Sequence, residues 1–287
     1  PGTGKTYLAK QIAAQLILQR PYSKDVENDS LFREHVGFVQ FHPSYDYTDF
    51  VEGLRAYENK KGDIGFRRQD GIFKAFCKKA LKEEGRYVFI IDEINRGEIS
   101  KIFGDLFFSI DPGYRGPSGR VMTQYQNLVK DDDDAFKDGF YIPENVFIIG
   151  TMNDIDRSVE SMDFAFRRRF AFVEIKANEN IGMLTDLGDD NLIKEAEKRM
   201  RGLNDAIFKD TPEGVSRIEG LSSAYHIGAS YFPRLNCYSG STDERFKKLW
   251  DYNLEGLLRE YLRGATDVEA KIRTLETAYK KNDETGF

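Results

Sequence analysis

The sequence is poor in the residues that build disulfide frameworks and zinc sites. Its 287 residues contain two cysteines, Cys77 and Cys237, and three histidines, His35, His42 and His226. Two cysteines cannot form a disulfide framework, and the histidines and cysteines lack the spacing of a structural zinc site. We therefore expect a reduced, cytoplasmic setting and no structural metal.

Long hydrophobic runs and excess positive charge are also missing. No apolar run approaches the roughly 20 residues that span a bilayer, and residues 1–8 lack the basic and apolar regions of a signal peptide. The net charge is −6, so any nucleic-acid contact must come from a local basic patch or from a partner. With 40% hydrophobic residues, 22 Phe and 15 Tyr, the chain is expected to fold as a soluble protein without a membrane partner.

Helical and strand patterns alternate through about the first 175 residues. Strands are expected at residues 36–41, within 86–95, at 146–151 and at 170–175, and helices at 7–19, 72–82, 99–109 and 161–167. The Gly- and charge-rich segment 59–71 is expected to be a surface insertion. After residue 176 only amphipathic helical patterns remain, at 191–208, 242–263 and 267–280. This order predicts a doubly wound αβα core at residues 1–176, followed by a smaller all-helical domain at residues 177–287.

The first six residues, PGTGKT, match the end of the phosphate-binding loop G-x-x-x-x-G-K-[ST]; the first glycine of that motif would precede Pro1. Glycines let successive backbone N–H groups point at one phosphate, and a following helix directs its positive end there. Lysine adds charge for the β- and γ-phosphates, and the last hydroxyl can bind magnesium. The candidate nucleotide-binding residues are therefore Gly2, Thr3, Gly4, Lys5 and Thr6. A simple turn before a helix remains the alternative.

Two carboxylates follow the apolar run VFII. Asp92 and Glu93 stand where a buried strand would deliver them to the crevice that holds the phosphate loop. In this Walker B arrangement Asp92, with Thr6, would hold Mg²⁺, and Glu93 would polarise the attacking water. An acidic pair that caps a helix is the alternative. Together the two motifs predict a magnesium-dependent nucleoside triphosphatase that uses GTP or ATP.

Three further stretches carry a family resemblance. DEINRG at 92–97, GTMNDIDRSV at 150–159 and DFAFRRRF at 163–170 resemble the AAA+ superfamily, specifically its McrB-like GTPase branch, the motor of methylcytosine-directed restriction systems. The resemblance is weaker at 226–232 and 252–264. The chain departs from the family pattern at Asp154, Ile155 and Ala229. The family implies an αβα core with a helical lid.

The resemblance also implies roles for particular residues. Asn153 would be the sensor that orients the lytic water, and Asp156 with Arg157 would form the signature of the branch. Arg168 would be the arginine finger inserted into a neighbouring subunit, supported by Arg169. The alternative for Asn153 is a turn residue at the end of a strand. For Asp156 and Arg157 it is a structural ion pair, and for the arginines it is a solvated basic corner.

The same resemblance implies partners. It predicts a ring of identical subunits, expected to be a hexamer, an McrC-like nuclease subunit, and DNA read by an N-terminal domain that this sequence does not include. A second hypothesis is a MoxR-like AAA+ chaperone that remodels protein complexes, and a third is a scaffold that binds nucleotide without hydrolysing it. The aromatic residues Tyr45, Tyr47 and Phe50 are expected to serve packing or a subunit interface rather than DNA, and Trp250 to lie in a helical core.

Overall fold

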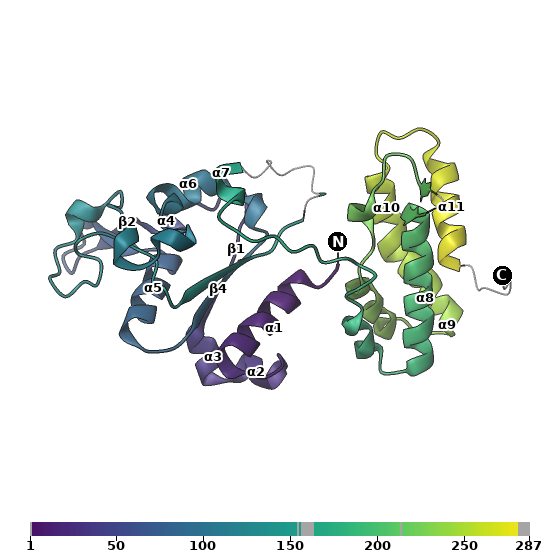
Figure 1. The fold of residues 1–287 in the computed structure, drawn as a ribbon, viewed down its shortest axis with the longest axis horizontal. Coiled ribbons are helices and arrows are strands. Elements are labelled where there is room, and N and C mark those ends of the chain that lie inside the picture. The colour runs from purple at the N-terminus through teal and green to yellow at the C-terminus, as the bar shows by residue number, and fades with distance from the viewer. Residues whose placement is uncertain (1, 154, 156–163, 213, 281–287) are drawn as a thin grey trace. The chain divides into compact units, whose positions relative to one another are not determined.

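The computed structural model describes residues 2–153, 155, 164–212 and 214–280 (Figure 1). They form two compact units. The N-terminal unit is Thr6–Phe172, and the C-terminal unit combines Pro1–Lys5 with Val173–Phe287. The sequence predicts a boundary after residue 176, whereas this division falls after Phe172 and groups the phosphate-loop residues up to Lys5 with the C-terminal unit. Within the described ranges, we find no helix long and apolar enough to cross a bilayer.

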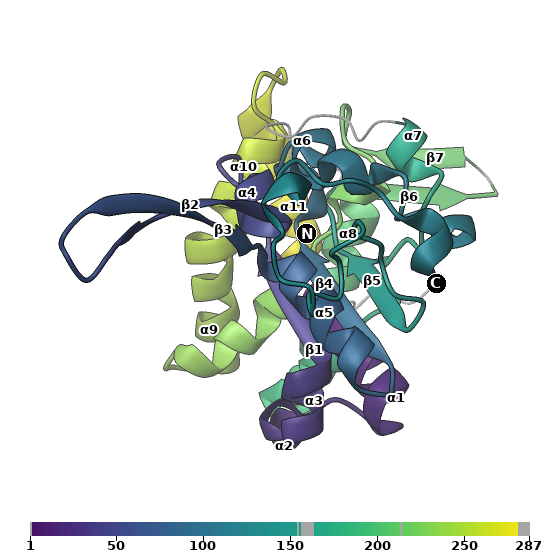
Figure 2. The same cartoon turned by 90° about the vertical axis from the view of Figure 1, so that its left-hand side faces the viewer.

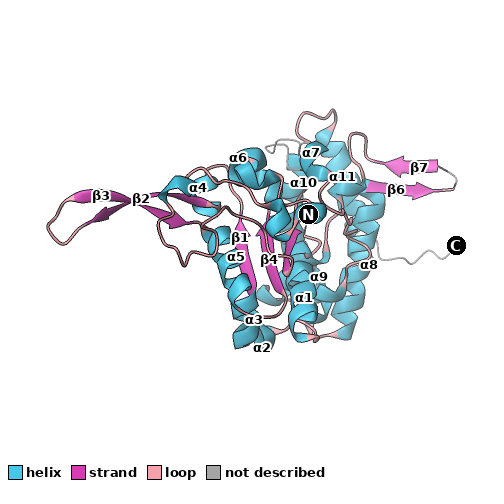
Figure 3. Cartoon of the chain, turned by 60° about the vertical axis from the view of Figure 1, so that its left-hand side comes forward, coloured by secondary structure: helices cyan, strands magenta, loops and turns pink. Residues whose placement is uncertain are grey.

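The N-terminal unit is built around a parallel sheet with the strand order β1-β4-β5. A separate antiparallel ribbon, β2–β3, completes its strands (Figure 3). The strands are β1 (Val36–Gln40), β2 (Glu52–Glu58), β3 (Ile64–Asp70), β4 (Tyr87–Asp92) and β5 (Val146–Gly150). The helices are α1 (Lys5–Leu18), which begins at the last loop residue, α2 (Lys24–Asn28), α3 (Ser30–His35), α4 (Tyr47–Phe50), α5 (Ile72–Lys82), α6 (Ile99–Phe103) and α7 (Phe164–Arg167).

Helices cover both faces of the sheet, as the central strand shows. Side chains of β4 alternate between two hydrophobic clusters, because successive residues of a strand point to opposite faces. Phe89 and Ile91 lie in the cluster beneath α4, α5 and α6, whereas Val88 and Ile90 pack with alanines of α1. All four are fully buried. This layering confirms the predicted αβα core.

The aromatic loop after β1 contributes to packing. Phe50 is fully buried and stacks on Phe73, with ring centroids 4.8 Å apart. Tyr45 and Tyr47 are partly buried against the same cluster. The interpretation of these rings as packing residues is confirmed.

The C-terminal unit is mainly helical. It contains α8 (Asp190–Ile207), α9 (Thr242–Leu249), α10 (Glu255–Tyr261) and α11 (Val268–Lys280), with a two-stranded hairpin, β6 (Phe208–Thr211) and β7 (Gly214–Arg217). A π-helical turn at Trp250–Leu254 joins α9 to α10. Trp250 is buried and packs beside Tyr279, which confirms its predicted place in a helical core.

Several expectations need correction. Residues 170–175 form no strand, because in the described part of the chain no strand lies beside them to share hydrogen bonds, and an alternating pattern alone does not make a stable strand. The helix expected at 99–109 is α at Ile99–Phe103 only and continues as a 3₁₀ turn at Gly104–Phe107. The hairpin β6–β7 was not predicted, since its exposed four-residue strands carry no buried pattern.

Candidate active site

Two parallel strands end side by side in the N-terminal unit, and polar residues follow both. Ile91 of β4 is in register with Gly150 of β5. The carboxyl ends of parallel strands face one edge of a sheet, where α/β proteins place their ligand sites. The sequence after β4 therefore lies beside the sequence after β5.

Asp92 is the meeting point of two hydroxyl groups. The Oγ1 of Thr6, at the start of α1, donates a hydrogen bond to Asp92 Oδ1 at 2.7 Å. The Oγ1 of Thr151 donates to the same oxygen at 2.6 Å. Thr6 and Thr151 are far from Asp92 in the sequence, so only the fold brings these three side chains together.

Glu93 follows Asp92 in an unusual backbone conformation. Its φ of 52° and ψ of 45° lie in the left-handed region. For a residue with a side chain such a conformation costs on the order of 1–3 kcal/mol and is typical of functional sites. The backbone N–H of Glu93 donates to Thr151 Oγ1 at 3.3 Å, so the threonine that binds Asp92 also supports the strained residue.

The carboxylate of Glu93 is held by an amide. Asn153 Nδ2 donates to Glu93 Oε1 at 2.8 Å. Arg96 Nε lies 3.5 Å from the other carboxylate oxygen, and Asn95 Nδ2 donates to the carbonyl of Asn153 at 3.1 Å. The side chain of Glu93 is 18% exposed and its Oε2 is buried, so the carboxylate is held in a largely enclosed position.

The described residues of the phosphate loop have the backbone that the motif requires. Gly2 and Gly4 adopt φ values of 71° and 75°, which glycine tolerates and other residues rarely adopt. Lys5 begins α1, and its Nζ lies 3.4 Å from Thr3 Oγ1. The loop is thus preformed, with a helix starting directly after it.

Within the C-terminal unit, this loop contacts segments far along the chain. The N–H of Ser230 donates to the carbonyl of Gly2 at 3.0 Å, and Asn180 Nδ2 donates to the carbonyl of Thr3. A Cβ at Gly228 would lie 2.1 Å from the Gly2 carbonyl oxygen, so the approach requires glycine there. Gly228 and Ser230 belong to the 226–232 stretch in which the sequence shows its weaker family resemblance.

The three consecutive arginines have different surroundings. Arg168 is exposed. The Arg169 guanidinium lies over the ring of Phe107 at 4.3 Å, and its Nη1 donates to the carbonyl of Ala165. Arg167 lies over Phe172 at 4.8 Å. Of the two arginines predicted to act on a neighbouring subunit, Arg168 is thus available at the surface and Arg169 is packed against the core.

The structure therefore brings together Thr6, Asp92, Glu93 and Asn153. Gly2, Thr3, Gly4 and Lys5 precede them in a loop that groups with the other unit. Arg168 and Arg169 stand outside the cluster, directly after the end of α7. Asp156 and Arg157 lie outside the described residues, so their role stays a prediction.

Thr151 and Arg96 are the residues that sequence reasoning missed. Both were visible within quoted motifs, Arg96 in DEINRG and Thr151 in GTMNDIDRSV. The position of Thr151 directly after an apolar strand pattern is a usable signal, because the carboxyl ends of such strands carry the ligand sites of α/β proteins.

The oxygen atoms around Asp92 suit Mg²⁺. This cation prefers hard oxygen ligands and is usually held by one or two carboxylates, with the remaining positions filled by water and substrate phosphates. Thr6 Oγ1 and Asp92 Oδ1 converge within 2.7 Å. Over the ranges that the structure describes there is no group of three or more His, Cys, Asp or Glu that could hold a metal unaided. The donors thus fit a magnesium ion that depends on a bound triphosphate.

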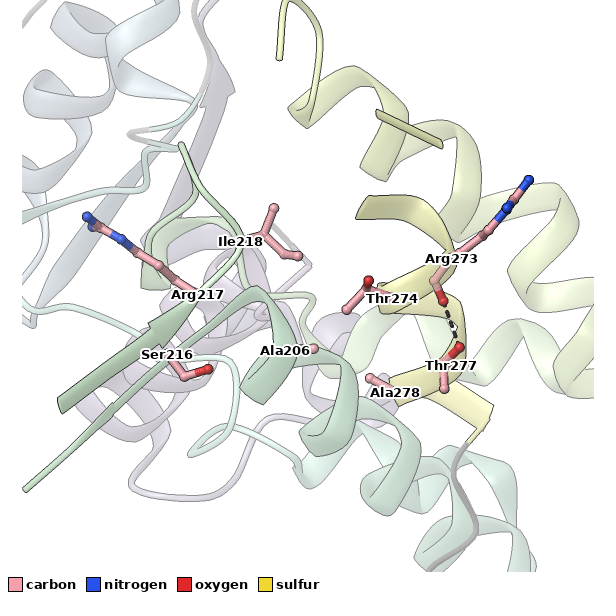
Figure 4. Close-up of a pocket in the computed structure, with 8 residues that line it drawn as sticks. All are labelled: Ala206, Ser216, Arg217, Ile218, Arg273, Thr274, Thr277 and Ala278. Carbon is pink, nitrogen blue, oxygen red and sulfur yellow. Dashed lines mark hydrogen bonds between the residues drawn. The ribbon is translucent and has the colours of Figure 1, made fainter. Parts of the chain in front are cut away.

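The C-terminal unit contains a separate open pocket of about 540 Å³ between α8, β7 and α11 (Figure 4). Its lining combines Ile218 and two alanines with Thr274 and Thr277, and no carboxylate or histidine is among the described residues that line it. Arg217 and Arg273 point away from each other, so they do not converge on one anion. This pocket lacks the groups for acid–base chemistry.

Comparison with known proteins agrees with this geometry. Residues 1–170 match the family described as AAA domain (dynein-related subfamily). The chain belongs to this family, and it is a P-loop nucleoside triphosphatase with an AAA+ core.

Two curated relatives place it more closely. The chain is 35% identical over 238 residues, 81% of its length and 45% of the relative's, to the "Type IV methyl-directed restriction enzyme EcoKMcrB subunit" of Escherichia coli (strain K12). It is 28% identical over 196 residues, 60% of its length and 54% of the relative's, to the "Type II restriction enzyme BsuMI component YdiS" of Bacillus subtilis (strain 168). The resemblance to the McrB-like branch is confirmed. The chain spans about half the length of these relatives.

Proposed function

We propose that this chain is the nucleotide-hydrolysing motor of a DNA restriction complex, and that it hydrolyses GTP or ATP with Mg²⁺. The observation that carries the proposal is the convergence of Thr6 and Asp92 beside Glu93 and Asn153 at the ends of β4 and β5. Both curated relatives are components of restriction enzymes, which supports the assignment to DNA-linked work.

The phosphate loop would bind the triphosphate. Gly2 and Gly4 have the positive φ values that let a phosphate loop point backbone amides at its ligand, and Lys5 at the start of α1 adds a positive charge. Thr6 and Asp92 would hold Mg²⁺, which supplies charge neutralisation to the β- and γ-phosphates when bound. Thr151 keeps Asp92 oriented by donating to the oxygen that Thr6 also contacts.

Glu93 would act as the general base. Its carboxylate accepts a proton from the attacking water and orients that water toward the γ-phosphate. Asn153 holds the carboxylate through Oε1, and an amide suits this place because it can donate and accept at once. The left-handed backbone at Glu93 fixes the direction in which the carboxylate leaves the strand.

Hydrolysis would be completed by a second subunit. Arg168 is exposed, as a residue that enters a neighbouring site must be, whereas Arg169 is packed on Phe107 and would position the end of α7. An arginine supplied in trans accelerates nucleotide hydrolysis by about 10³ to 10⁵. A ring, with a hexamer expected, would therefore be the active form, and Asp156 and Arg157 would join the same interface. An McrC-like nuclease subunit is the proposed partner, with DNA recognition in a separate N-terminal domain.

The decisive experiment measures hydrolysis of GTP and ATP by the intact protein, with and without DNA and the co-encoded nuclease subunit. We expect turnover that requires Mg²⁺ and rises on assembly, with GTP preferred. The variant Glu93→Gln should bind nucleotide and not turn it over. Turnover unchanged in Glu93→Gln would contradict the enzymatic mechanism and favour a nucleotide-dependent scaffold.

The same assay separates the motor from a chaperone. Stimulation by DNA or by the nuclease subunit supports the restriction motor. Stimulation by an unrelated protein substrate, with none by DNA, would instead support a MoxR-like remodelling ATPase.

A further inference from the structure

The β2–β3 ribbon stands out from the rest of the N-terminal unit (Figure 2). Its strands pair from Glu52 and Asp70 at the root to Glu58 and Ile64 near the turn. A two-stranded ribbon has two open faces, and this one also has large exposed side chains: Ile64 is 77% exposed and Phe66 71%. Nothing in the nucleotide site explains this element.

The register sorts the ribbon into two different faces. Residues directly opposite each other in an antiparallel pair point to the same side, and neighbours along a strand point to opposite sides. One face is mostly apolar toward the turn, where its exposed members are Leu54, Ala56, Ile64, Phe66 and the acidic Glu58. The other face is basic and aromatic, and consists of Gly53, Arg55, Tyr57, Gly65, Arg67 and Gln69.

The basic face contains a like-charge pair. Arg55 and Arg67 are direct cross-strand partners. Such an arrangement is destabilising unless anions compensate it. Asp49 lies 2.6 Å from Arg55, and the guanidinium of Arg67 lies 5.8 Å from the ring centre of Tyr57. Among the described residues, the arginine pair is thus only partly balanced by anions.

The turn continues the positive charge. Lys60 and Lys61 are both exposed at the tip of the ribbon. Residues 53–67 contain four basic and two acidic side chains, although the whole chain carries a net charge of −6. The ribbon is therefore a local basic patch on an acidic protein. An acidic protein needs such a patch to bind a polyanion.

The root of the ribbon is fixed by buried ion pairs. Glu52 Oε2 lies 2.7 Å from Lys74 Nζ and 2.9 Å from Arg68 Nη1, and both Glu52 and Lys74 are fully buried. Asp70 and Asp134 extend the network through Arg68 and Lys78. An isolated two-stranded hairpin is marginally stable in water, so this anchor allows the ribbon to hold its direction.

We propose that the β2–β3 ribbon contacts the phosphate backbone of duplex DNA through Arg67, Lys60 and Lys61, with Arg55 beside them. A two-stranded ribbon fits the major groove of duplex DNA. The basic face and the turn carry an excess of positive charge, and this charge complements the negative phosphates of DNA. This contact would be independent of base sequence, and it rests on the proposed function as a DNA-linked motor.

The test measures binding of the intact protein to a fluorescent, unmethylated duplex of about 30 base pairs across a salt series. The plot of log K against log salt has a negative slope, and each lost phosphate contact should reduce the magnitude of that slope by about 0.9. We expect Lys60→Gln with Lys61→Gln to make the slope less steep by about 2, and Arg67→Gln by about 1. The matched control is Lys24→Gln with Lys82→Gln, two exposed lysines of α2 and α5, which should leave the slope unchanged.

Two further measurements keep the result interpretable. Urea unfolding midpoints of the ribbon variants should match that of the wild type, so that a lost contact is not a lost fold. Ile64→Ser with Phe66→Ser, on the apolar face, should leave the salt slope as it is.

The failures are distinguishable. A wild type whose hydrolysis responds to DNA, but whose salt slope is unmoved by the Lys60, Lys61 and Arg67 variants, would overturn the ribbon contact and leave the motor intact. If instead only the Ile64 and Phe66 variants disrupt assembly with the nuclease subunit, the ribbon is a protein-docking element. A wild type that hydrolyses nucleotide without any response to DNA would count against the proposed restriction motor itself.

Discussion

The N-terminal unit contains two clusters of charged groups with opposite designs. At the root of the ribbon, Glu52 is fully buried and contacts the cations of Lys74 and Arg68 directly. At the end of β4, Asp92 and Glu93 are adjacent carboxylates whose described partners include two hydroxyls and an amide, with Arg96 at 3.5 Å. The first cluster pairs buried charges with one another. The second holds two adjacent carboxylates at the place where a cation and a water would bind.

The comparison shows how one unit holds charged groups for two purposes, stability and catalysis. Buried charges are costly unless paired, so the ion pairs at the root of the ribbon have to be complete. A carboxylate in tight contact with a cation would be a poor base and a poor magnesium ligand, and the hydroxyls of Thr6 and Thr151, the amide of Asn153 and a strained backbone orient the site. Substitutions should therefore separate stability from turnover.

The largest expected effect is on turnover. Glu93→Gln keeps the shape of the side chain and removes the base, so kcat should fall by about 10² to 10⁴. Nucleotide binding, followed with a fluorescent GTP or ATP analogue, should stay within a few-fold of the wild type. The free energy of unfolding should change little, and a large loss of stability would show that Glu93 belongs to the structural type of cluster after all.

The buried ion pairs at the root of the ribbon should show the reverse, a large effect on stability. Lys74→Met removes a buried cation and leaves Glu52 buried with less compensation, so the free energy of unfolding should fall by about 3 kcal/mol. Urea denaturation measures this change. Lys82→Met, at an exposed position of the same helix, is the matched control and should lie within about 0.5 kcal/mol of the wild type. Equal effects in the two variants would refute the role of the buried pair.

Thr151 shares features of both clusters, because it is buried like the ion pairs but lies within the catalytic site. Thr151→Val leaves Asp92 with one hydroxyl donor and the Glu93 N–H without its acceptor. We expect this change to lower the free energy of unfolding by about 1–3 kcal/mol. We expect kcat to fall about tenfold or more and the Mg²⁺ concentration for half-maximal turnover to rise. Thr151→Ser should restore both. If kcat falls as much in Thr151→Ser as in Thr151→Val, the hydrogen bonds of the Thr151 hydroxyl do not explain the loss of turnover.

The smallest effect is on the pH dependence of stability. Burial opposes ionisation of Glu52, but hydrogen bonds from Lys74 and Thr123 outweigh it and hold the pKa of this carboxyl below its ordinary value of 4.5. The folded state then binds the proton less readily than the unfolded state does, so the ionised carboxylate stabilises the fold above pH 4.5. This contribution should be lost as the pH falls through the lowered pKa. Glu52→Gln should flatten the unfolding free energy over that window, and an unchanged pH profile would be evidence against the anchor.

Much of the site could be predicted from the sequence. Asp92 and Glu93 follow a continuous apolar run, and a strand with both faces buried must end at an edge of the sheet. The glycines and lysine of the loop are spaced for a phosphate, and Asn153 follows a second apolar strand pattern. Each of these predictions depends on neighbours in the sequence, and the structure brings Thr6, Asp92, Glu93 and Asn153 together.

Other features depend on partners distant in the sequence. The ribbon was expected only as a surface insertion, since Gly62, Gly65 and many charges suppress a strand pattern. Lys74 belongs to an amphipathic helix, and only its contact with Glu52 explains why a lysine lies buried there. Thr151 was one residue of a longer motif until its hydroxyl was found between Asp92 and the N–H of Glu93.

By itself, the sequence determined the class of this protein: the order of strands and helices, the phosphate loop and the paired carboxylates are local patterns, and backbone preferences and hydrophobic periodicity act locally. The tertiary structure decided which of these groups meet. Thr6, Thr151 and Asp92 share one oxygen, and Arg55 faces Arg67 across a ribbon, because strand register and sheet order bring together residues whose separation in the chain says nothing about their distance in space.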